Sequence, residues 1–308
     1  MIDISKAREL DEDTFAGLEA LVRECDLADG TRGEVGRDKS LNYHRDMASW
    51  FVAREGAPGA APGAVSGAIL GFASVFAPES ETAELSALVR PSARRRGIFA
   101  GLFAAARGEL AAFGYRDLLL VRDAASAAGG ALIAGWGSRR GAAIDHREFA
   151  MLLGEAGRAP RAPAGDPGVS LFRAGQADLP ALAAMAASEF GGSAEESLRF
   201  LEATAANPER SLLAARASPG GPVLGMVSVH VDGERASINA LVVDPAARRR
   251  GLGSRLLDEA AALALGKGAR EVGLEVDALN RGALGIYLRR GFEVVSEVEY
   301  WRMPLPQS

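Results

Sequence analysis

The sequence predicts an α/β protein that contains two tandem copies of one fold, each with a mixed sheet. An internal repeat is the first reason, because residues 89–99 echo residues 243–253 at an offset of 154, half of the 308-residue chain. The second reason is that strand-like and helix-like stretches alternate in both halves. Between the halves, residues 154–168 are rich in Pro, Gly and Ala and have no apolar period. We therefore predict domains at residues 1–154 and 168–308, joined by a linker at 155–167.

The first copy has apolar residues at helical spacing near its start and an arginine-rich turn near its middle. Its expected helices cover residues 14–25, 41–49 and 97–113. Its expected strands cover residues 50–54, 68–77, 82–89, 117–122 and 144–153. A Gly- and Pro-rich loop is expected at 56–63, and the strands on either side of residues 78–81 are expected to form a hairpin.

The second copy repeats this plan with clearer boundaries, and Asp232-Gly233 is a strong hairpin signal. Its expected helices cover residues 179–190, 194–205 and a stretch that starts near Gly251. Its expected strands cover residues 169–173, 212–216, 223–231, 237–243 and 271–277.

The composition is that of a globular protein, with 48% hydrophobic and 24% charged residues. A formal charge of −5 gives no reason to expect binding to nucleic acid or to a membrane surface. The first residues lack a signal-peptide pattern and no apolar run is long enough to span a bilayer, so a cytoplasmic location is expected. Cys25 is the only cysteine, so we expect a core thiol and no multi-cysteine metal site.

The stretch that carries most functional information lies between the expected strand at 237–243 and the helix after it. Asp244-Pro245 ends the strand, and Arg248, Arg249 and Arg250 precede Gly251 and Gly253 at the helix start. A helix start exposes unpaired N–H groups and the positive end of the dipole, and glycines let an anion approach the backbone closely. The stretch therefore predicts phosphate binding.

Two other phosphate-binding motifs are compared with this stretch. A Walker loop needs a Gly-Lys-Ser/Thr ending, which is absent. A dinucleotide fingerprint needs a third glycine where Leu256 stands, although Glu271 lies at about the right distance for the ribose-binding acid. The dinucleotide interpretation stays open as a weaker alternative, and so does a solvated basic turn.

Residues 248–253, RRRGLG, resemble the pyrophosphate loop of the GNAT acyltransferase superfamily, Gln/Arg-x-x-Gly-x-Gly/Ala, at every defined position. Farther along, the Asn280, Ala283, Tyr287 and Gly291-Phe292 pattern is similar to a second signature of that family. This resemblance covers most of both halves, but only the second half carries both motifs.

The resemblance implies which residues contact an acyl-CoA. Main-chain groups from Arg249 to Ser254 would hold the pyrophosphate, at Arg249, Arg250, Gly251, Leu252, Gly253 and Ser254. Arg248 is also expected to contact the cofactor. The strand edge at Leu241, Val242 and Val243 would pair with the pantetheine arm, and one of its N–H groups would polarise the thioester.

The same resemblance gives Tyr287 the role of the acid that protonates the leaving thiolate, with packing as the alternative. It places Asn280 near the cofactor arm, with helix capping as an alternative that is compatible with this role.

The general base is not identified by the sequence. Many members of the family have a glutamate on the central strand at the position that Ser237 occupies here. Glu234, Glu275 and Asp277 are alternatives, each equally consistent with a solvated charge. A bound water is a further possibility in such enzymes. The three histidines, His44, His146 and His230, are isolated and are expected to be surface or packing residues.

The first copy departs from the family pattern. Phe99 stands where the second small residue of the loop is expected, and no Asn or Tyr occurs where Asn280 and Tyr287 stand in the second copy. Cofactor binding and catalysis are therefore not expected there.

The resemblance implies an N-acetyltransferase that transfers an acetyl group from acetyl-CoA to a primary amine of a small-molecule or peptide acceptor. Tandem copies of this length also resemble the mycothiol synthase group, which acetylates the amine of a cysteinyl pseudodisaccharide. A non-catalytic acyl-CoA sensor is a third alternative. The acceptor and the oligomeric state cannot be predicted from the sequence.

Overall fold

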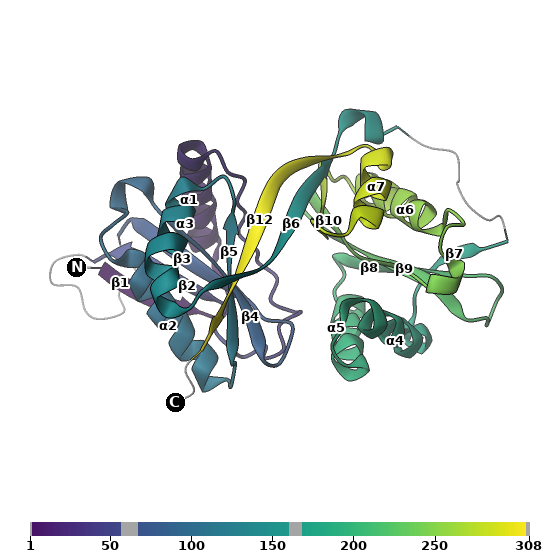
Figure 1. Ribbon diagram of the computed structural model, residues 1–308, viewed down its shortest axis with the longest axis horizontal. Helices are drawn as coiled ribbons and strands as arrows, with labels where there is room; N and C mark the ends of the chain where they lie inside the picture. Colours follow the sequence, from purple (N-terminus) through teal and green to yellow (C-terminus); the bar gives the residue numbers. More distant parts are fainter. Residues whose placement is uncertain (1, 57–66, 160–167, 306–308) are drawn as a thin grey trace. The chain divides into compact units, whose positions relative to one another are not determined.

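The structure is a computed structural model that describes residues 2–56, 67–159 and 168–305 (Figure 1). Most of the expected loop at 56–63 and of the linker at 155–167 lies outside these residues. The chain forms two compact units. The first unit comprises residues 1–147 and 296–308, and the second comprises residues 148–295.

The first unit has a mixed sheet in the order β1-β2-β3-β4-β5-β12, in which only β4 and β5 are parallel. Its strands are β1 (Ile2–Ala7), β2 (Trp50–Glu55), β3 (Ile69–Phe76), β4 (Thr82–Val89), β5 (Asp117–Asp123) and part of β12 (Phe292–Pro304). Its helices are α1 (Glu12–Asp29), α2 (Ile98–Ala112) and α3 (Ala127–Leu132).

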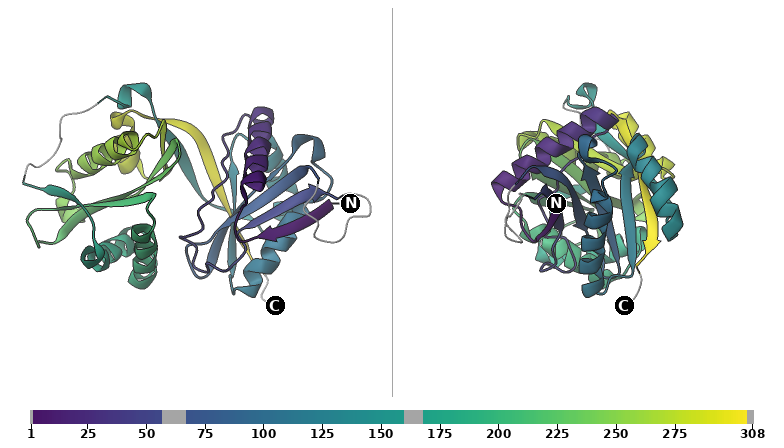
Figure 2. Two further views of the ribbon diagram at one scale, coloured as in Figure 1. Left: turned by 180° about the vertical axis from the view of Figure 1, so that it is seen from behind. Right: turned by 90° about the vertical axis from the view of Figure 1, so that its left-hand side faces the viewer.

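Helices cover both faces of this sheet, as seen from a second direction in Figure 2. Leu18, Leu21 and Cys25 of α1 are fully buried against one face. Leu102 and Ala106 of α2 are fully buried against the other. Both helices were predicted from apolar residues that recur every 3.6 residues, because this spacing places them on the one face of the helix that packs against the sheet.

The second unit has a mixed sheet in the order β6-β11-β10-β9-β8-β7, in which only β10 and β11 are parallel. Its strands are part of β6 (Ala143–Leu153), β7 (Ser170–Arg173), β8 (Arg210–Arg216), β9 (Val223–Asp232), β10 (Arg235–Val243) and β11 (Glu271–Asp277). Its helices are α4 (Leu179–Phe190), α5 (Ala194–Ala206), α6 (Leu252–Gly266) and α7 (Arg281–Arg290).

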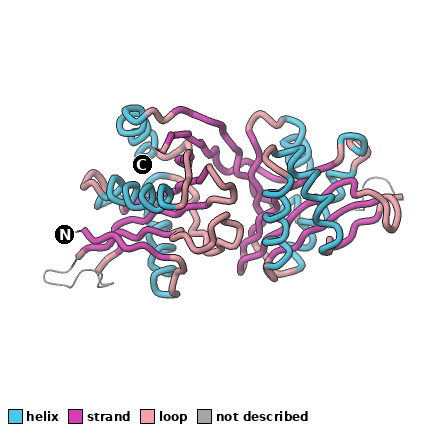
Figure 3. Tube along the Cα trace, turned by 90° about the horizontal axis from the view of Figure 1, so that it is seen from below, coloured by secondary structure: helices cyan, strands magenta, loops and turns pink. Residues whose placement is uncertain are grey.

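The helices of the second unit also lie on both faces of its sheet (Figure 3). α4 and α5 pack on one face, where Leu182 contacts a cluster that contains Met226. α6 packs on the other face, with Leu256 and Leu257 fully buried. This arrangement leaves the start of α6 at the end of β10, where the sequence predicts anion binding.

The two units differ from the contiguous domains expected at 1–154 and 168–308, because each receives a strand from the other half of the sequence. Residues 298–304 of β12 pair with β5 in the first unit. Residues 148–152 of β6, expected to close the first copy, pair instead with β11 in the second unit. Backbone pairing is nearly independent of side-chain identity, so equivalent strands of two tandem copies can exchange places.

The linker also begins farther along than expected. Gly154 donates a backbone hydrogen bond to Gly291 at 2.9 Å, and Arg290 donates to the Gly157 carbonyl. A Cβ on Gly291 would approach the Gly157 Cα to 2.9 Å, so glycine is required where these two segments touch. Residues 154–157 therefore belong to the second unit.

Most expected elements are present, but the helix expected at 41–49 is not formed. Residues 41–49 form turns and bends, because the buried Asn42 side chain donates to Ser49 Oγ at 3.0 Å and accepts from Ala77 N at 2.8 Å. Strand β1, the short helix α3 and strand β12 were not expected from the sequence.

Candidate active site

The central strand of the second unit, β10, separates from its parallel neighbour partway along its length. Residues 235–237 of β10 pair with residues 271–273 of β11, and no later pairing between them occurs in the described part of the chain. β10 continues to Val243, so the edge that follows Ser237 is not paired with β11. We call this opening, residues 238–243 of β10 on the side of β11, the strand gap. An unpaired strand edge can bind an extended ligand through its main chain.

A β-bulge lies within the strand gap. The register between β10 and β9 shifts between Asn239 and Val242, and Ala240 has φ of 52°. A non-glycine residue in the left-handed region costs on the order of 1–3 kcal/mol, so the surrounding structure must hold it there. Bulges re-aim backbone and side-chain groups. In the first unit, the corresponding pairing of β3 with β4 is continuous from Gly71 to Phe76.

The strand gap leads directly into the glycine-containing loop and the start of α6. Arg249 and Gly251 have positive φ angles of 63° and 79°, and no side chain caps α6. The first N–H groups of this 15-residue helix therefore lack a side-chain acceptor, and they lie at the positive end of its dipole. This geometry suits a phosphate.

The first arginine of the loop has a bracing role that sequence reasoning did not identify. Arg248 Nε donates to the Val243 carbonyl at 2.9 Å, and its Nη2 lies 2.5 Å from Glu189 at the end of α4. The first unit repeats this arrangement, since Arg94 donates to the Val89 carbonyl and to both carboxylate oxygens of Asp29. The Arg248 guanidinium therefore holds the strand end, although Arg248 is exposed, as Arg249 and Arg250 are.

Tyr287 lies on α7 within the apolar cluster that α6 forms with the sheet. Its side chain is 7% exposed, and its ring packs edge-on against Phe292 with centroids 6.1 Å apart. Burial raises the pKa of Tyr287 to about 12, so the phenol is protonated at neutral pH. Its hydroxyl forms no hydrogen bond with the described residues, which leaves it able to donate to a ligand.

Asn280 caps α7, because its Oδ1 accepts from Ala283 N at 3.1 Å. Helix capping was the alternative to cofactor contact for this residue, and the two remain compatible. In the first unit, Ser126 occupies the equivalent position, 154 residues earlier, and caps α3 by accepting from Gly129 N at 3.0 Å. The capping role is therefore common to both units, whereas the amide is present only in the second.

The carboxylates considered as bases lie in different places. Glu234 is in the β9–β10 hairpin and forms an ion pair with Arg270 at 3.1 Å, which accounts for it as a surface charge. Asp277 accepts from Leu279 N at 2.7 Å and thereby stabilises the turn before α7. Glu275 is an exposed residue of β11. Ser237, at the start of the strand gap, accepts a hydrogen bond from Asn239 Nδ2 at 3.0 Å.

In the first unit, an aromatic and an aliphatic side chain occupy the positions that correspond to Gly253 and Tyr287. Phe99 stacks on Phe103 and packs edge-on against Trp136, with centroids 6.2 and 5.1 Å apart. Ile133, 154 residues before Tyr287, is 5% exposed and has no hydroxyl. The loop nevertheless keeps its backbone conformation, with φ of 65° at Arg95 and 79° at Gly97.

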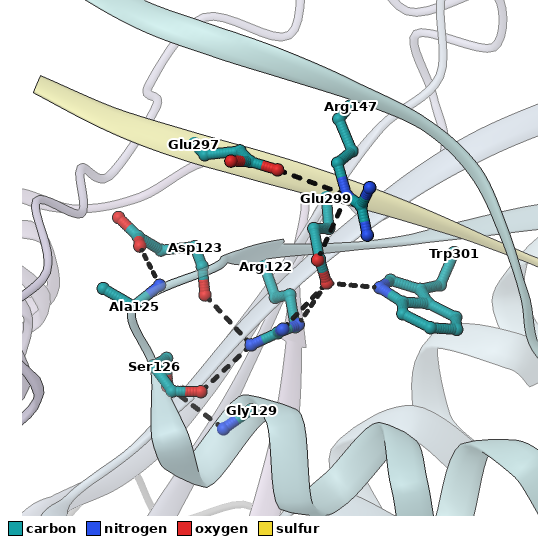
Figure 4. A network of polar contacts seen from close by, with 9 residues as sticks. All are labelled: Arg122, Asp123, Ala125, Ser126, Gly129, Arg147, Glu297, Glu299 and Trp301. Atoms are coloured by element: carbon teal, nitrogen blue, oxygen red, sulfur yellow. Dashed lines mark hydrogen bonds and ion pairs between the residues drawn. The ribbon is translucent and has the colours of Figure 1, made fainter. Parts of the chain in front are cut away.

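A buried carboxylate network in the first unit fixes β12 to β5 (Figure 4). Glu299 of β12 accepts from Arg122 Nε at 2.8 Å, from Trp301 Nε1 at 2.9 Å and from Arg147 Nε at 3.3 Å. Burial alone would raise the pKa of Glu299, but the Trp301 hydrogen bond and the positive charges of Arg122 and Arg147 outweigh it and lower that pKa. The network therefore requires an ionised carboxylate.

Replacing Glu299 with Gln should lower the free energy of unfolding of the first unit by about 2 kcal/mol near pH 7, because charge-assisted hydrogen bonds are lost. A lowered folded-state pKa gives stability that is complete above the ordinary value of 4.5 and is lost as pH falls through the folded-state pKa. The difference between the proteins in denaturant unfolding should therefore shrink in acid. The control is Glu297→Gln, because Glu297 is an exposed carboxylate that also forms an ion pair with Arg147. A difference that is independent of pH would contradict this account.

No helix among the described residues is long and apolar enough to cross a membrane.

Comparison with known proteins gives the class to which this fold and site belong. Residues 179–292 match the acetyltransferase (GNAT) family. The mycothiol acetyltransferase of Nocardioides sp. is 31% identical over 230 residues, which cover 68% of this chain and 76% of the relative. The chain therefore belongs to the GNAT acetyltransferase family.

Two further relatives differ in how much of their length is matched. The mycothiol acetyltransferase of Clavibacter sepedonicus is 41% identical over 93 residues, and the match spans 30% of each chain. A tandem GNAT protein from the clavulanic acid biosynthesis pathway has a TM-score of 0.70 at 19% identity, with all of both chains covered. That likeness establishes the tandem fold.

Proposed function

We propose that this protein is an N-acetyltransferase that transfers the acetyl group of acetyl-CoA to a primary amine of a small-molecule or peptide acceptor, at the second unit. The observation that supports this most is the strand gap of β10, which leads directly into an uncapped helix start. The gap offers main-chain pairing to an extended arm and the helix start offers N–H groups to a pyrophosphate. Acetyl-CoA has both parts in this order.

In this proposal, the main-chain N–H groups of residues 249–254 hold the pyrophosphate. The edge at Leu241, Val242 and Val243 pairs with the pantetheine arm. One N–H of this edge donates to the thioester oxygen, where negative charge develops as the amine attacks. The bulge at Ala240 supports this assignment because it turns the edge away from regular sheet pairing.

Tyr287 assists the departure of the thiolate in this proposal. The new C–N bond forms, the C–S bond breaks, and the sulfur receives the phenolic proton while the amine nitrogen loses one. A phenol with a pKa of about 12 is protonated at neutral pH but is a weak acid, so its main contribution is a hydrogen bond that strengthens as charge develops on sulfur. The positively charged amine nitrogen of the tetrahedral adduct is the source that reprotonates it.

Replacing Gly251 with Val should raise the Kd for acetyl-CoA by about tenfold or more, because φ of 79° is strained for a β-branched residue and its side chain crowds the N–H groups. Calorimetry measures this change. Gly97→Val is the matched control, because Gly97 has the same φ of 79° in the first unit. We expect one acetyl-CoA per chain, and equal effects of the two variants on binding would contradict the assignment to the second unit.

The proposed activity is tested by incubating the full chain with acetyl-CoA and a panel of primary amines, followed by thiol detection and mass measurement of the products. Release of CoA together with an acetylated amine supports the enzyme. Acetyl-CoA binding without turnover on any amine would instead indicate a sensor.

A second candidate deserves a place in this panel, because the Nocardioides relative covers 68% of the chain and is named a mycothiol acetyltransferase. An acceptor of that type presents the amine of a cysteinyl group. A cysteinyl glycoside that is acetylated much faster than simple alkyl amines would favour this acceptor class.

A further inference from the structure

His230 lies next to the point where β10 and β11 separate. It is on β9 and pairs directly with Ser237 of β10, which is the last residue of β10 that pairs with β11. Directly opposed residues of antiparallel strands point to the same face, with Cβ atoms about 4.5–5.5 Å apart. The imidazole is therefore beside Ser237 at the closed end of the strand gap.

The face on which these two side chains lie is opposite to α6. Ala236 and Ile238 are buried in the cluster that includes α6, so Ser237 and Asn239 between and after them point to the other face. Ser237 is partly exposed and Asn239 is exposed. An acceptor amine can therefore approach the strand gap from this face.

The ring nitrogen of His230 is available for proton transfer. Nε2 is buried and has no hydrogen-bond partner among the described residues. Glu209 Oε2 lies 3.5 Å from it, close enough to stabilise the ring electrostatically after protonation. Glu209 is thus the ion-pair partner of this nitrogen when the ring is protonated, and a neutral ring leaves the nitrogen free to accept a proton.

Ser237 is suited to link His230 to a bound amine. Its Oγ accepts from Asn239 Nδ2 at 3.0 Å, so its own hydrogen can be donated to a different acceptor. A hydroxyl in this state passes a proton by accepting one from an amine and giving its own to a base.

We propose that His230 is the proton acceptor for the amine and acts through Ser237. This proposal rests on the proposed acetyltransferase function. The acceptor arrives as an ammonium ion and gives one proton to the Ser237 hydroxyl as that hydroxyl gives its proton to His230 Nε2. The neutral amine then attacks the thioester. The second N–H proton replaces the one that Tyr287 gives to the thiolate, and the imidazolium releases its proton to solvent.

Several charged groups lie on the same face of the sheet as His230. Arg210 of β8 pairs with it across the strands, and Asp232 and Arg235 form the next pair along β9 and β10. On β11, Glu271 pairs with Arg235 and Glu275 lies farther along. Together with Glu209, these groups place both negative and positive charges near the imidazole. The test therefore compares the pH profiles of variants of this protein with one another.

The test compares the full-length protein with His230→Gln, using acetyl-CoA and the best amine from the panel. Near pH 7, kcat/KM for the amine should fall at least about tenfold, because solvent replaces the base only in part. The Kd for acetyl-CoA should not change. The deficit should shrink as pH rises toward the pKa of the amine, since the amine then arrives deprotonated. His146→Gln, a change at a half-buried histidine of the first unit, is the control.

A rescue variant separates proton transfer from a structural effect. Ser237→Glu introduced into His230→Gln places a carboxylate on the same face, and it should recover most of the lost kcat/KM near pH 7. Ser237→Ala alone should reproduce the pH-dependent loss without changing the imidazole.

Equal activity and equal pH profiles of His230→Gln and the unmodified protein would overturn the proposal, as would a loss that is the same at every pH and is not rescued. An unmodified protein that acetylates no amine would overturn the proposed function and this role with it. An active unmodified protein whose His230 variants are unaffected would overturn this role alone.

Discussion

Deletion of residues 296–308 is expected to abolish cooperative folding of the first unit and to leave the second unit folded. The deleted segment holds most of β12, which pairs with β5 over residues 117–123. Tyr300, Met303 and Leu305 are at most 5% exposed, and burying each side chain contributes about 1.5–3 kcal/mol. Their sum, about 6 kcal/mol at 2 each, is comparable with the total stability of a domain.

Two further losses add to this effect. Arg122 would lose the Glu299 carboxylate that accepts its hydrogen bond at 2.8 Å, which leaves a partly buried charge without that partner. β5 would become an edge strand that carries Leu118, Leu119 and Leu120, and exposed apolar edges promote aggregation.

Hydrogen exchange followed by mass spectrometry measures the two units separately. Peptides from β2, β3 and β5 should lose protection, whereas peptides from β8 and β9 should keep it, and one acetyl-CoA should still bind per chain. Deletion of residues 306–308 alone removes no described residue and is the control. Retained protection in β5 after the longer deletion would show that β12 is dispensable for this unit.

The elements of the fold could be predicted from local patterns, but the exchange of strands could not. β4, β11 and α4 have the residue ranges that apolar spacing and turn residues predicted. The pairing of β12 with β5 depends on backbone hydrogen bonds that either copy could satisfy, and no side-chain period encodes that choice. A fragment that begins at 168 would lack Met151 and Leu153, which are buried in the second unit, so an isolated second unit should begin at 148.

The candidate site also has parts that could be predicted from the sequence and parts that could not. The loop at 248–253 was recognisable because a helix start after glycines has a fixed local conformation, and Arg249 and Gly251 adopt it. The contact between Arg248 and Glu189 joins residues 59 apart in sequence. The sequence alone does not show which of the three consecutive arginines makes this contact. His230 was expected to be a surface or packing residue because the three histidines are isolated in the sequence. Its pairing with Ser237 depends on the register of the hairpin, which the sequence did not define.

Tyr287→Phe should reduce kcat by on the order of 10²-fold and change the Kd for acetyl-CoA little, because it removes one hydroxyl that acts when the thiolate departs. The ring contributes the packing, since it lies 6.1 Å from the Phe292 ring within an apolar cluster. The hydroxyl has no partner among the described residues, so its removal should not destabilise the fold. Unchanged thermal unfolding is therefore part of the expected result.

Two measurements distinguish this role from packing. The loss in kcat should be smaller for an acyl donor with a more acidic thiol, because a better leaving group needs less help from a hydrogen-bond donor. Leu288 is the exposed neighbour of Tyr287, so Leu288→Ala is the control for a general structural change in α7. Equal kcat for Tyr287→Phe and the unmodified protein with acetyl-CoA would return Tyr287 to the packing residues. A loss that did not depend on the thiol would place its effect before C–S cleavage, because only that step charges the sulfur.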